Sequence, residues 1–248
     1  MVELPKYLIN VLQKYIDDKD KRLIRIDALR IADSLRSTGM IQPGRSEPQS
    51  KLGSAASVNG VPQKPSGEQE SGPKPNTAVR IPSLFDPNLF LEPHVLEYGE
   101  RETAAYIASR MPATYGVIAN VLTEASRRIP WLNPTRVLDF GTGPATALWA
   151  MKEVWGDSVK QFTGIDISEP MLQSAEAIME LASATEIFPE VEFKRYLAPR
   201  GNAEQYDLVM CAFTLSDLPN DTIRKATVQE LWNYTKDTLV IIDRGTPH

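Results

Sequence analysis

Cysteine, histidine and long apolar runs are nearly absent from this chain, and each absence excludes a class of protein. The single cysteine, Cys211, cannot form an intramolecular disulfide, which is typical of reducing compartments. No segment approaches the roughly 18 consecutive apolar residues of a transmembrane helix, so no membrane partner is expected. The two histidines, His94 and His248, have neither metal-ligand nor triad spacing around them. The sequence therefore predicts no metal site and leaves the catalytic residues unknown.

Positive charge is scarce over most of the chain. Residues 1–80 hold 13 Lys and Arg against 9 Asp and Glu, whereas residues 81–248 hold 14 against 23. Nucleic-acid binding depends largely on Lys and Arg that neutralise phosphates. DNA is therefore not an expected partner, and contact with RNA would depend on local basic patches or on accompanying proteins.

Composition divides the chain into three parts. Residues 1–39 carry apolar side chains at helical spacing, broken near residues 17–20, which predicts a helical hairpin appendage. Residues 40–82 are rich in Pro, Gly, Ser, Gln and Asn and are predicted to form a flexible linker. Residues 83–248 form the third part, the main domain. The first residues carry an early acid and start no Arg- and Ser-rich amphipathic stretch, so no presequence is predicted.

The main domain alternates between helical and extended patterns. Two helices are predicted first, at about 97–109 and 112–128, either covering the sheet or presenting Arg101, Arg110, Arg127 and Arg128 to RNA. Short apolar segments then alternate with helical ones, and apolar strands joined by helices are typical of a mostly parallel sheet with right-handed crossovers. The sequence predicts an α/β fold with a doubly wound, mostly parallel sheet. The expected strands are 136–139, 162–166, 191–193, 206–212 and 238–242, with helices at about 144–155, 170–183 and 221–235.

Two acidic residues, Asp139 and Asp166, end the first two predicted strands. After Asp139, Gly141 and Gly143 lack side chains, so backbone N–H groups can approach a ligand and the chain can adopt positive φ. A helix is expected to begin near Pro144. Asp166 occupies the usual place of a carboxylate that accepts hydrogen bonds from ribose hydroxyls. The pattern indicates a bound nucleoside, and the lack of lysine near the loop argues against a triphosphate.

Two other interpretations of this pattern remain open. Glycines can serve a tight strand-to-helix turn through geometry alone. A dinucleotide oxidoreductase is the nearest functional rival, but the pyrophosphate of its cofactor disfavours an acid at position 139. The third glycine of that enzyme class is also replaced, here by Thr146.

The two acids and the helix-opening segment Ser168–Leu172 together resemble the class I S-adenosylmethionine-dependent methyltransferases. The resemblance implies that Asp139 lies near the methionine end of the cofactor and that Asp166 holds the ribose. It also implies a wider set of residues that bind S-adenosyl-L-methionine. That set is Asp139, Gly141, Thr142, Gly143, Asp166, Ile167 and Phe213.

Segments outside the cofactor motif sharpen the resemblance. Those at 101–106, 110–115, 128–130, 214–219 and 244–247 are similar, in this order, to the methyltransferase-like, Rsm-type family of mitochondrial small-subunit ribosome assembly proteins. The similarity covers about residues 95–248. It implies a mitochondrial location, weak or lost transferase activity, and a partner in the small ribosomal subunit precursor, with its rRNA and ribosomal proteins.

The chain departs from that family near its carboxyl end. Many members carry a cysteine-rich iron–sulfur segment after the Gly-Thr-Pro element, so an iron–sulfur cluster is expected only in a longer form of this protein. The last strands of the sheet are expected to be absent as well. The loop after Cys211 lacks the Asn-Pro-Pro-aromatic segment of many amino- and nucleobase methyltransferases. Two functions stay open: an assembly factor that binds the cofactor, and an active methyltransferase acting on rRNA or ribosomal protein.

Overall fold

The structure is a computed structural model that describes residues 4–37, 98–197 and 205–245. The predicted linker, residues 40–82, and His94 and His248 lie outside the described residues. The division of the chain into three parts therefore stays a prediction.

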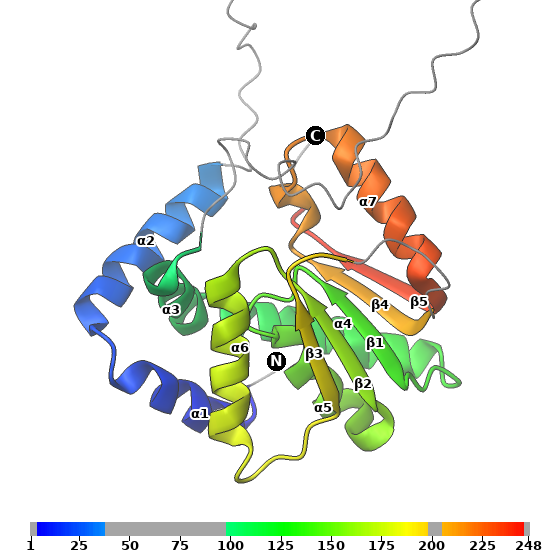
Figure 1. Cartoon of the computed structure of the whole chain (residues 1–248), viewed down its shortest axis with the longest axis horizontal. Helices are drawn as coiled ribbons and strands as arrows, with labels where there is room; N and C mark the ends of the chain where they lie inside the picture. The colour runs from blue at the N-terminus through cyan, green and yellow to red at the C-terminus, as the bar shows by residue number, and fades with distance from the viewer. Residues whose placement is uncertain (1–3, 38–97, 198–204, 246–248) are drawn as a thin grey trace, which may run out of the picture. The chain divides into compact units, whose positions relative to one another are not determined.

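The described strands form one parallel sheet, as the sequence predicts. The sheet order is β3-β2-β1-β4-β5, and every neighbouring pair is parallel (Figure 1). From β1 the chain winds outward through β2 and β3 on one side, and through β4 and β5 on the other. The order therefore reverses between β1 and β4, and ligands of open α/β sheets bind at the carboxyl ends of the strands beside such a point. The strands are β1 Arg136–Phe140, β2 Gln161–Ile165, β3 Glu190–Lys194, β4 Tyr206–Ala212 and β5 Thr235–Ile242.

Helices cover both faces of the sheet. Neighbouring residues of a strand point to opposite faces, and in β1 Val137 joins the core beneath α5 and α6 whereas Leu138 joins the core beneath α7. Cys211 lies in the second core and is fully buried, as expected of a structural cysteine. The helices after the N-terminal pair are α3 Glu100–Ser109, α4 Met111–Arg128, α5 Thr146–Trp155, α6 Glu169–Ala182 and α7 Asp221–Tyr234.

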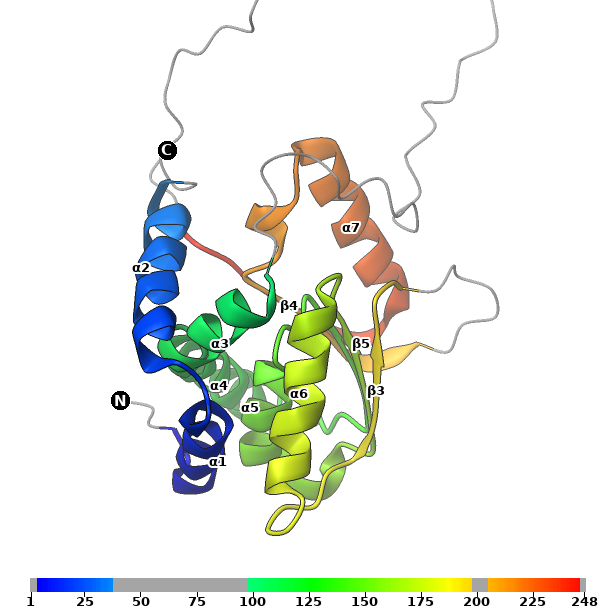
Figure 2. The same cartoon turned by 60° about the vertical axis from the view of Figure 1, so that its left-hand side comes forward.

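The N-terminal segment forms two helices, α1 (Lys6–Asp17) and α2 (Lys21–Ser37), where the sequence predicts a hairpin (Figure 2). They do not pack along each other as the helices of a hairpin would, because α1 packs mainly against α6 and α2 packs against α3. The Tyr15 hydroxyl of α1 lies 2.7 Å from the Ser174 Oγ of α6, and α2 packs along α3. Between α2 and α3, the Arg101 Nη2 donates to Asp27 Oδ2 at 2.8 Å, and the Asp27 side chain is only 1% exposed. None of the described helices is long and apolar enough to cross a membrane.

Candidate functional site

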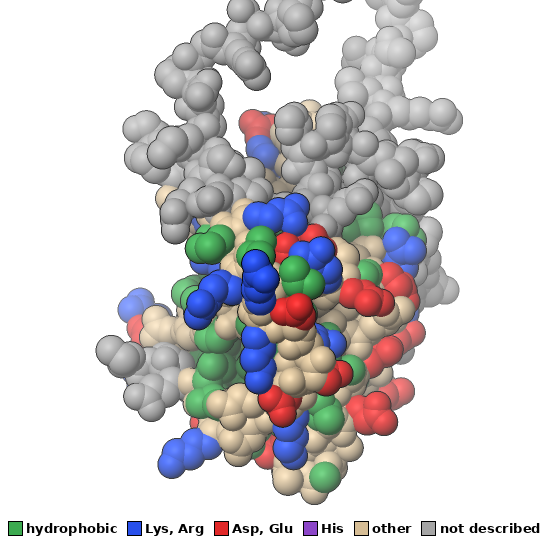
Figure 3. Space-filling view, turned by 90° about the vertical axis from the view of Figure 1, so that its left-hand side faces the viewer, with side chains coloured by type: hydrophobic (Ala, Val, Ile, Leu, Met, Phe, Trp, Pro, Cys, Tyr) green, Lys and Arg blue, Asp and Glu red, His purple; other side chains and the backbone are tan. Residues whose placement is uncertain are grey.

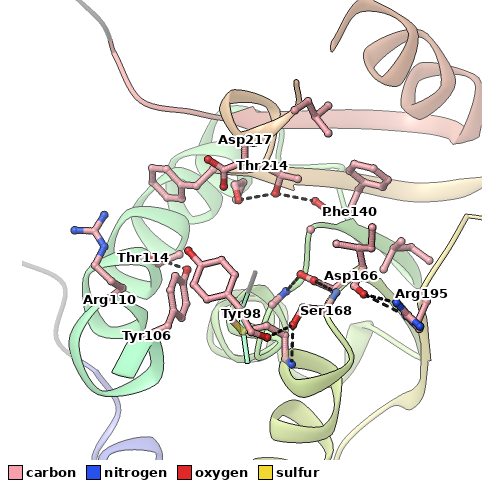
Figure 4. Close-up of a pocket in the computed structure, with 18 of the residues that line it drawn as sticks. Tyr98, Tyr106, Arg110, Thr114, Phe140, Asp166, Ser168, Arg195, Thr214 and Asp217 are labelled. Atoms are coloured by element: carbon pink, nitrogen blue, oxygen red, sulfur yellow. Dashed lines mark hydrogen bonds between the residues drawn. The ribbon is translucent and has the colours of Figure 1, made fainter. Parts of the chain in front are cut away.

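A cavity of about 180 Å³ lies at the carboxyl ends of β1, β2 and β4, beside the reversal of strand order (Figure 4). Its wall comes from the strand ends, from α3 and the residue Tyr98 before it, from the starts of α4 and α6, and from the loops after β3, β4 and β5. Most of the wall is apolar or aromatic, with a few charged groups, as is usual for small-molecule sites. The charged side chains that line it are Arg110, Asp166, Arg195, Asp217 and Arg244.

The loop after β1 is a tight turn in which three residues have positive φ. These are Gly141 at 78°, Gly143 at 53° and Ala145 at 58°. The left-handed Ala145 caps α5, so the helix begins at Thr146 and the prediction of a start near Pro144 was wrong. A Cβ at Gly141 would lie 1.9 Å from Thr214 Oγ1, whereas one at Gly143 would meet only Met171 Sδ, 4.0 Å away. Gly141 is therefore required by packing, and Gly143 leaves room at the cavity wall.

Asp166 joins this loop to the start of α6. Its Oδ2 accepts from the Gly143 N–H at 2.8 Å, and its Oδ1 accepts from the Ser168 N–H at 2.9 Å. Burial raises the pKa of Asp166, and the two backbone hydrogen bonds partly offset that rise. A carboxylate oxygen can accept two hydrogen bonds, so each oxygen keeps capacity for a ligand hydroxyl. The Ser168 hydroxyl also donates to the Tyr98 carbonyl at 3.0 Å, which fixes the segment before α3.

Asp139 lies behind the loop rather than in the cavity wall. Its side chain is almost fully buried, with 2% of the residue exposed, and Thr142 beside it is also buried. Burial raises the pKa of Asp139 to about 7, with a smaller opposing effect from Thr142. Of the predicted cofactor-binding residues, the structure brings five to the cavity wall and leaves Asp139 and Thr142 outside it. The five are Gly141, Gly143, Asp166, Ile167 and Phe213.

The raised pKa of Asp139 predicts a pH-dependent stability. An unfolded aspartate has a pKa of about 3.9, so between that pH and about 7 the folded state binds the extra proton. The contribution of Asp139 to the free energy of unfolding must therefore fall as pH rises from about 4 to 7, and above that pH it stays constant. Asp139→Asn should remove it, and urea denaturation between pH 4.5 and 8 measures the difference between variant and wild type. The exposed Asp157→Asn serves as control, and identical pH dependence of wild type and Asp139→Asn would contradict the prediction.

The segment after β4 forms the opposite wall. The Phe213 N–H donates to the Ile242 carbonyl at 2.7 Å, and Phe213 itself has a φ of 59°. Positive φ is uncommon for a bulky residue, so this turn is held by its surroundings. The Thr214 hydroxyl then donates to the Ala212 carbonyl at 3.2 Å and lies against Gly141. The turn after β1 and the turn after β4 therefore contact each other at the cavity wall.

Asp217 supplies a carboxyl to this wall. Arg244 Nη2 donates to Asp217 Oδ1 at 2.8 Å, and the Ser216 N–H donates to Asp243 Oδ2 at 2.9 Å, so the end of β5 holds the loop. Burial raises the pKa of Asp217 to about 6, although Arg244 opposes the rise. Asp217 can therefore change its protonation state near neutral pH.

Sequence reasoning missed the part of the wall that comes from α3 and α4. The Tyr98 and Tyr106 rings meet edge to face with centroids 5.7 Å apart, and the Tyr106 hydroxyl lies 3.4 Å from Thr114 Oγ1 (Figure 4). Burial raises the pKa of both phenols, so they stay neutral and can donate hydrogen bonds. These residues lie far before the first strand, and no strand-end signal marks them. Asp217 could have been found, because it follows β4 at the carboxyl edge.

The four arginines that could face RNA are in different surroundings. Arg110 lines the cavity, Arg101 pairs with Asp27, and Arg128 Nε lies 2.6 Å from Glu124 Oε1. Arg127 is exposed at the end of α4. The structure therefore does not bring these arginines together as one unpaired group.

Several known proteins are similar to this chain. A mitochondrial ribosome assembly protein of Homo sapiens, METTL17, is 33% identical over 153 residues, which are 61% of this chain. The chain spans about a third (33%) of that relative's length. Among solved structures, the magnesium protoporphyrin IX methyltransferase of Synechocystis PCC 6803, with bound S-adenosylmethionine, is 20% identical. The similarity covers 53% of this chain and 62% of that one, with a TM-score of 0.40.

An O-methyltransferase family protein of Burkholderia thailandensis is 14% identical, covering 58% of this chain and 42% of that one, with a TM-score of 0.46. The family comparison covers the carboxyl-terminal part of the chain. Residues 100–248, more than half of the chain, match the profile described as "Mitochondrial small ribosomal subunit Rsm22". The match begins with α3, includes every described strand, and contains most of the residues that line the cavity. The chain belongs to the Rsm22 family of the mitochondrial small ribosomal subunit.

Proposed function

We propose that this protein is a mitochondrial assembly factor of the small ribosomal subunit that holds S-adenosyl-L-methionine in the cavity beside β1, β2 and β4. Family membership and the human relative, whose name describes a ribosome assembly protein, support the role in assembly. One observation carries the choice of ligand. Asp166 lies at the cavity wall with both oxygens fixed by backbone N–H groups, where a ribose would be recognised.

The residues present fit this cofactor. Asp166 would accept hydrogen bonds from the ribose hydroxyls, while Ile167 and Leu197 offer apolar surface to the adenine. The side-chain space left at Gly143 lets the amino-acid part of the ligand approach the backbone. Asp139 and Thr142 would support the loop from behind it. When bound, S-adenosylmethionine supplies an electrophilic methyl group, which would lie between the glycine loop and the wall that contains Phe213.

Active methyl transfer to rRNA or ribosomal protein is the second candidate. It is favoured by Asp217 and Tyr98, which place a carboxyl and a phenol in the same cavity. Such groups can orient an acceptor, and transfer to a positioned nucleophile depends mainly on proximity. The acceptor-orienting Asn-Pro-Pro segment has no counterpart at Phe213–Pro219. We therefore propose the role in assembly as the first candidate function and methyl transfer as the second.

The proposed partner is the small-subunit precursor, with its rRNA and ribosomal proteins. Between residues 81 and 248 acids outnumber bases, so phosphate attraction alone would give weak binding. Among the residues that the structure describes, no group of three or more Cys, His, Asp and Glu could hold a metal ion. Because Cys211 is the one cysteine of the sequence, an iron–sulfur cluster held by several cysteines is proposed only for a longer form of the protein.

The two candidates can be separated in cells that lack the endogenous protein. Wild-type and Asp217→Asn forms are expressed there, and rRNA methylation and small-subunit yield are measured. For an assembly factor, Asp217→Asn should give normal subunit yield with every methyl mark retained. Loss of one defined methyl group, with subunit yield falling in proportion, would show instead that catalysis is the function.

A further inference from the structure

The outward side of α2 carries a stripe of arginine and aliphatic residues, Arg22, Arg25, Ile26 and Leu29, called the α2 stripe below. Residues at this spacing share one side of a helix. The opposite side faces inward, where Asp27 and Ile31 are each only 1% exposed. One side of α2 is therefore packed against the protein, and the side that carries the stripe faces solvent.

The α2 stripe includes two exposed aliphatic side chains. Ile26 is 45% exposed and Leu29 is 64% exposed, one helical turn apart. Figure 3 shows this side of the molecule, where Lys and Arg gather with hydrophobic side chains between them. A single exposed aliphatic side chain needs no explanation. Two neighbouring aliphatic side chains beside two arginines indicate a surface suited to a partner.

The two arginines of the stripe are available for that partner. Over the described ranges 4–37, 98–197 and 205–245, the guanidinium groups of Arg22 and Arg25 have no ion-pair or hydrogen-bond partner, although both side chains are exposed. Arg30 and Arg101, by contrast, both bind the buried Asp27. Arg30 and Arg101 therefore anchor α2 through Asp27, whereas the arginines of the stripe offer positive charge outward.

We propose that the α2 stripe docks on a small-subunit protein whose surface has an apolar centre and an acidic rim. Protein interfaces combine an apolar core with a polar rim and are enriched in arginine, as the stripe is. RNA recognition would favour aromatic side chains for stacking, and the stripe has none. Membrane binding scales with buried apolar area, and two aliphatic residues offer little. The stripe extends about 10 Å along α2, from Arg22 to Leu29.

The proposal rests on the proposed role in assembly and is tested by site-specific photo-cross-linking. The full chain carries p-benzoylphenylalanine in place of Leu29, and the probe is the purified small-subunit precursor particle. Trp232, 61% exposed on α7, is the matched position. Binding of the chain to the particle is followed by co-sedimentation in the same samples.

We expect Leu29 to cross-link to an acidic segment of one small-subunit protein, and Trp232 not to cross-link to that segment. R22E with R25E should lower the cross-link yield at least tenfold, because two attractive rim charges become repulsive. R127E with K225E makes the same charge change at exposed positions elsewhere and should leave the yield unchanged. All variants should melt within about 2 °C of wild type, since exposed substitutions change stability little.

The possible failures are distinguishable. If wild type does not co-sediment with the particle, the proposed function fails and the docking proposal fails with it. If wild type co-sediments but Leu29 cross-links to rRNA, to a second copy of the chain or to nothing, only the docking proposal is overturned. A cross-link that R22E with R25E leaves unchanged would also overturn it.

Discussion

Replacing Gly141 with alanine should lower the free energy of unfolding by about 3 kcal/mol. Left-handed backbone costs a residue with a Cβ about 1–2 kcal/mol, and Gly141 has a φ of 78°. The new Cβ would also overlap Thr214, whose Oγ1, Cγ2 and Cβ all lie within 2.7 Å of its position. Overpacking of this kind typically costs about 1–3 kcal/mol. In a domain of this size the melting temperature should fall by roughly 6–12 °C, which calorimetry can measure.

A matched glycine separates the two costs. Gly156 has a φ of 56°, but a Cβ there would have nothing within 4 Å. Gly156→Ala should therefore show only a backbone cost, about 1–3 kcal/mol for this sparsely populated conformation. Adding Thr214→Gly to Gly141→Ala should recover about 1 kcal/mol or more of coupling energy. Equal losses at Gly141 and Gly156, with no coupling to Thr214, would mean that the two turns do not meet as described.

Replacing Asp166 with asparagine should weaken binding of S-adenosylhomocysteine at least tenfold. Asparagine has one acceptor oxygen, so its NH₂ group would face either the Gly143 N–H or the Ser168 N–H, where a carboxylate oxygen now accepts. Losing a hydrogen bond to a charged group costs about 1.5–3 kcal/mol, and 1.4 kcal/mol corresponds to about a factor of ten in Kd. Isothermal titration calorimetry on the full chain gives the two affinities.

The exposed Glu176 on α6, the helix that follows Asp166, provides the control for charge. Glu176→Gln removes one negative charge from α6 without touching the cavity wall, and it should bind the ligand as wild type does. The melting temperature of Asp166→Asn shows whether the variant is folded at the temperature of the titration. Equal affinity for the folded Asp166→Asn variant and wild type would exclude Asp166 from the binding site.

The sheet could be predicted from sequence because its signals are local. Strands of a parallel sheet are buried on both faces, and β4 shows this in the sequence as the continuous apolar segment Leu208–Ala212. The positions of Asp166 and the glycines follow from the same pattern, since carboxyl ends of parallel strands meet at one edge. The residues on this side of the cavity, Asp166 and the glycines after β1, could therefore be predicted to lie close together.

The other side depends on packing between segments far apart in the chain. Tyr98 and Tyr106 reach the cavity because α3 packs beside α6 and the Ser168 hydroxyl holds the Tyr98 carbonyl. Arg244 reaches it because β5 ends beside the loop that carries Asp217. The start of α5 was misplaced because Ala145 adopts a left-handed conformation that propensity does not foresee. The spacing of apolar residues within a short segment does not indicate which distant segments will pack together.

A crystal structure of the full chain with S-adenosylhomocysteine would test most directly that the cavity is the cofactor site. The ribose hydroxyls should lie within hydrogen-bonding distance of the Asp166 carboxylate, with the amino-acid part over Gly143 and the sulfur facing the wall formed by Phe213 and Asp217. The adenine should contact Ile167 and Leu197. Ligand bound elsewhere on the chain, or an empty cavity at saturating ligand, would contradict the proposal that this cavity holds S-adenosyl-L-methionine.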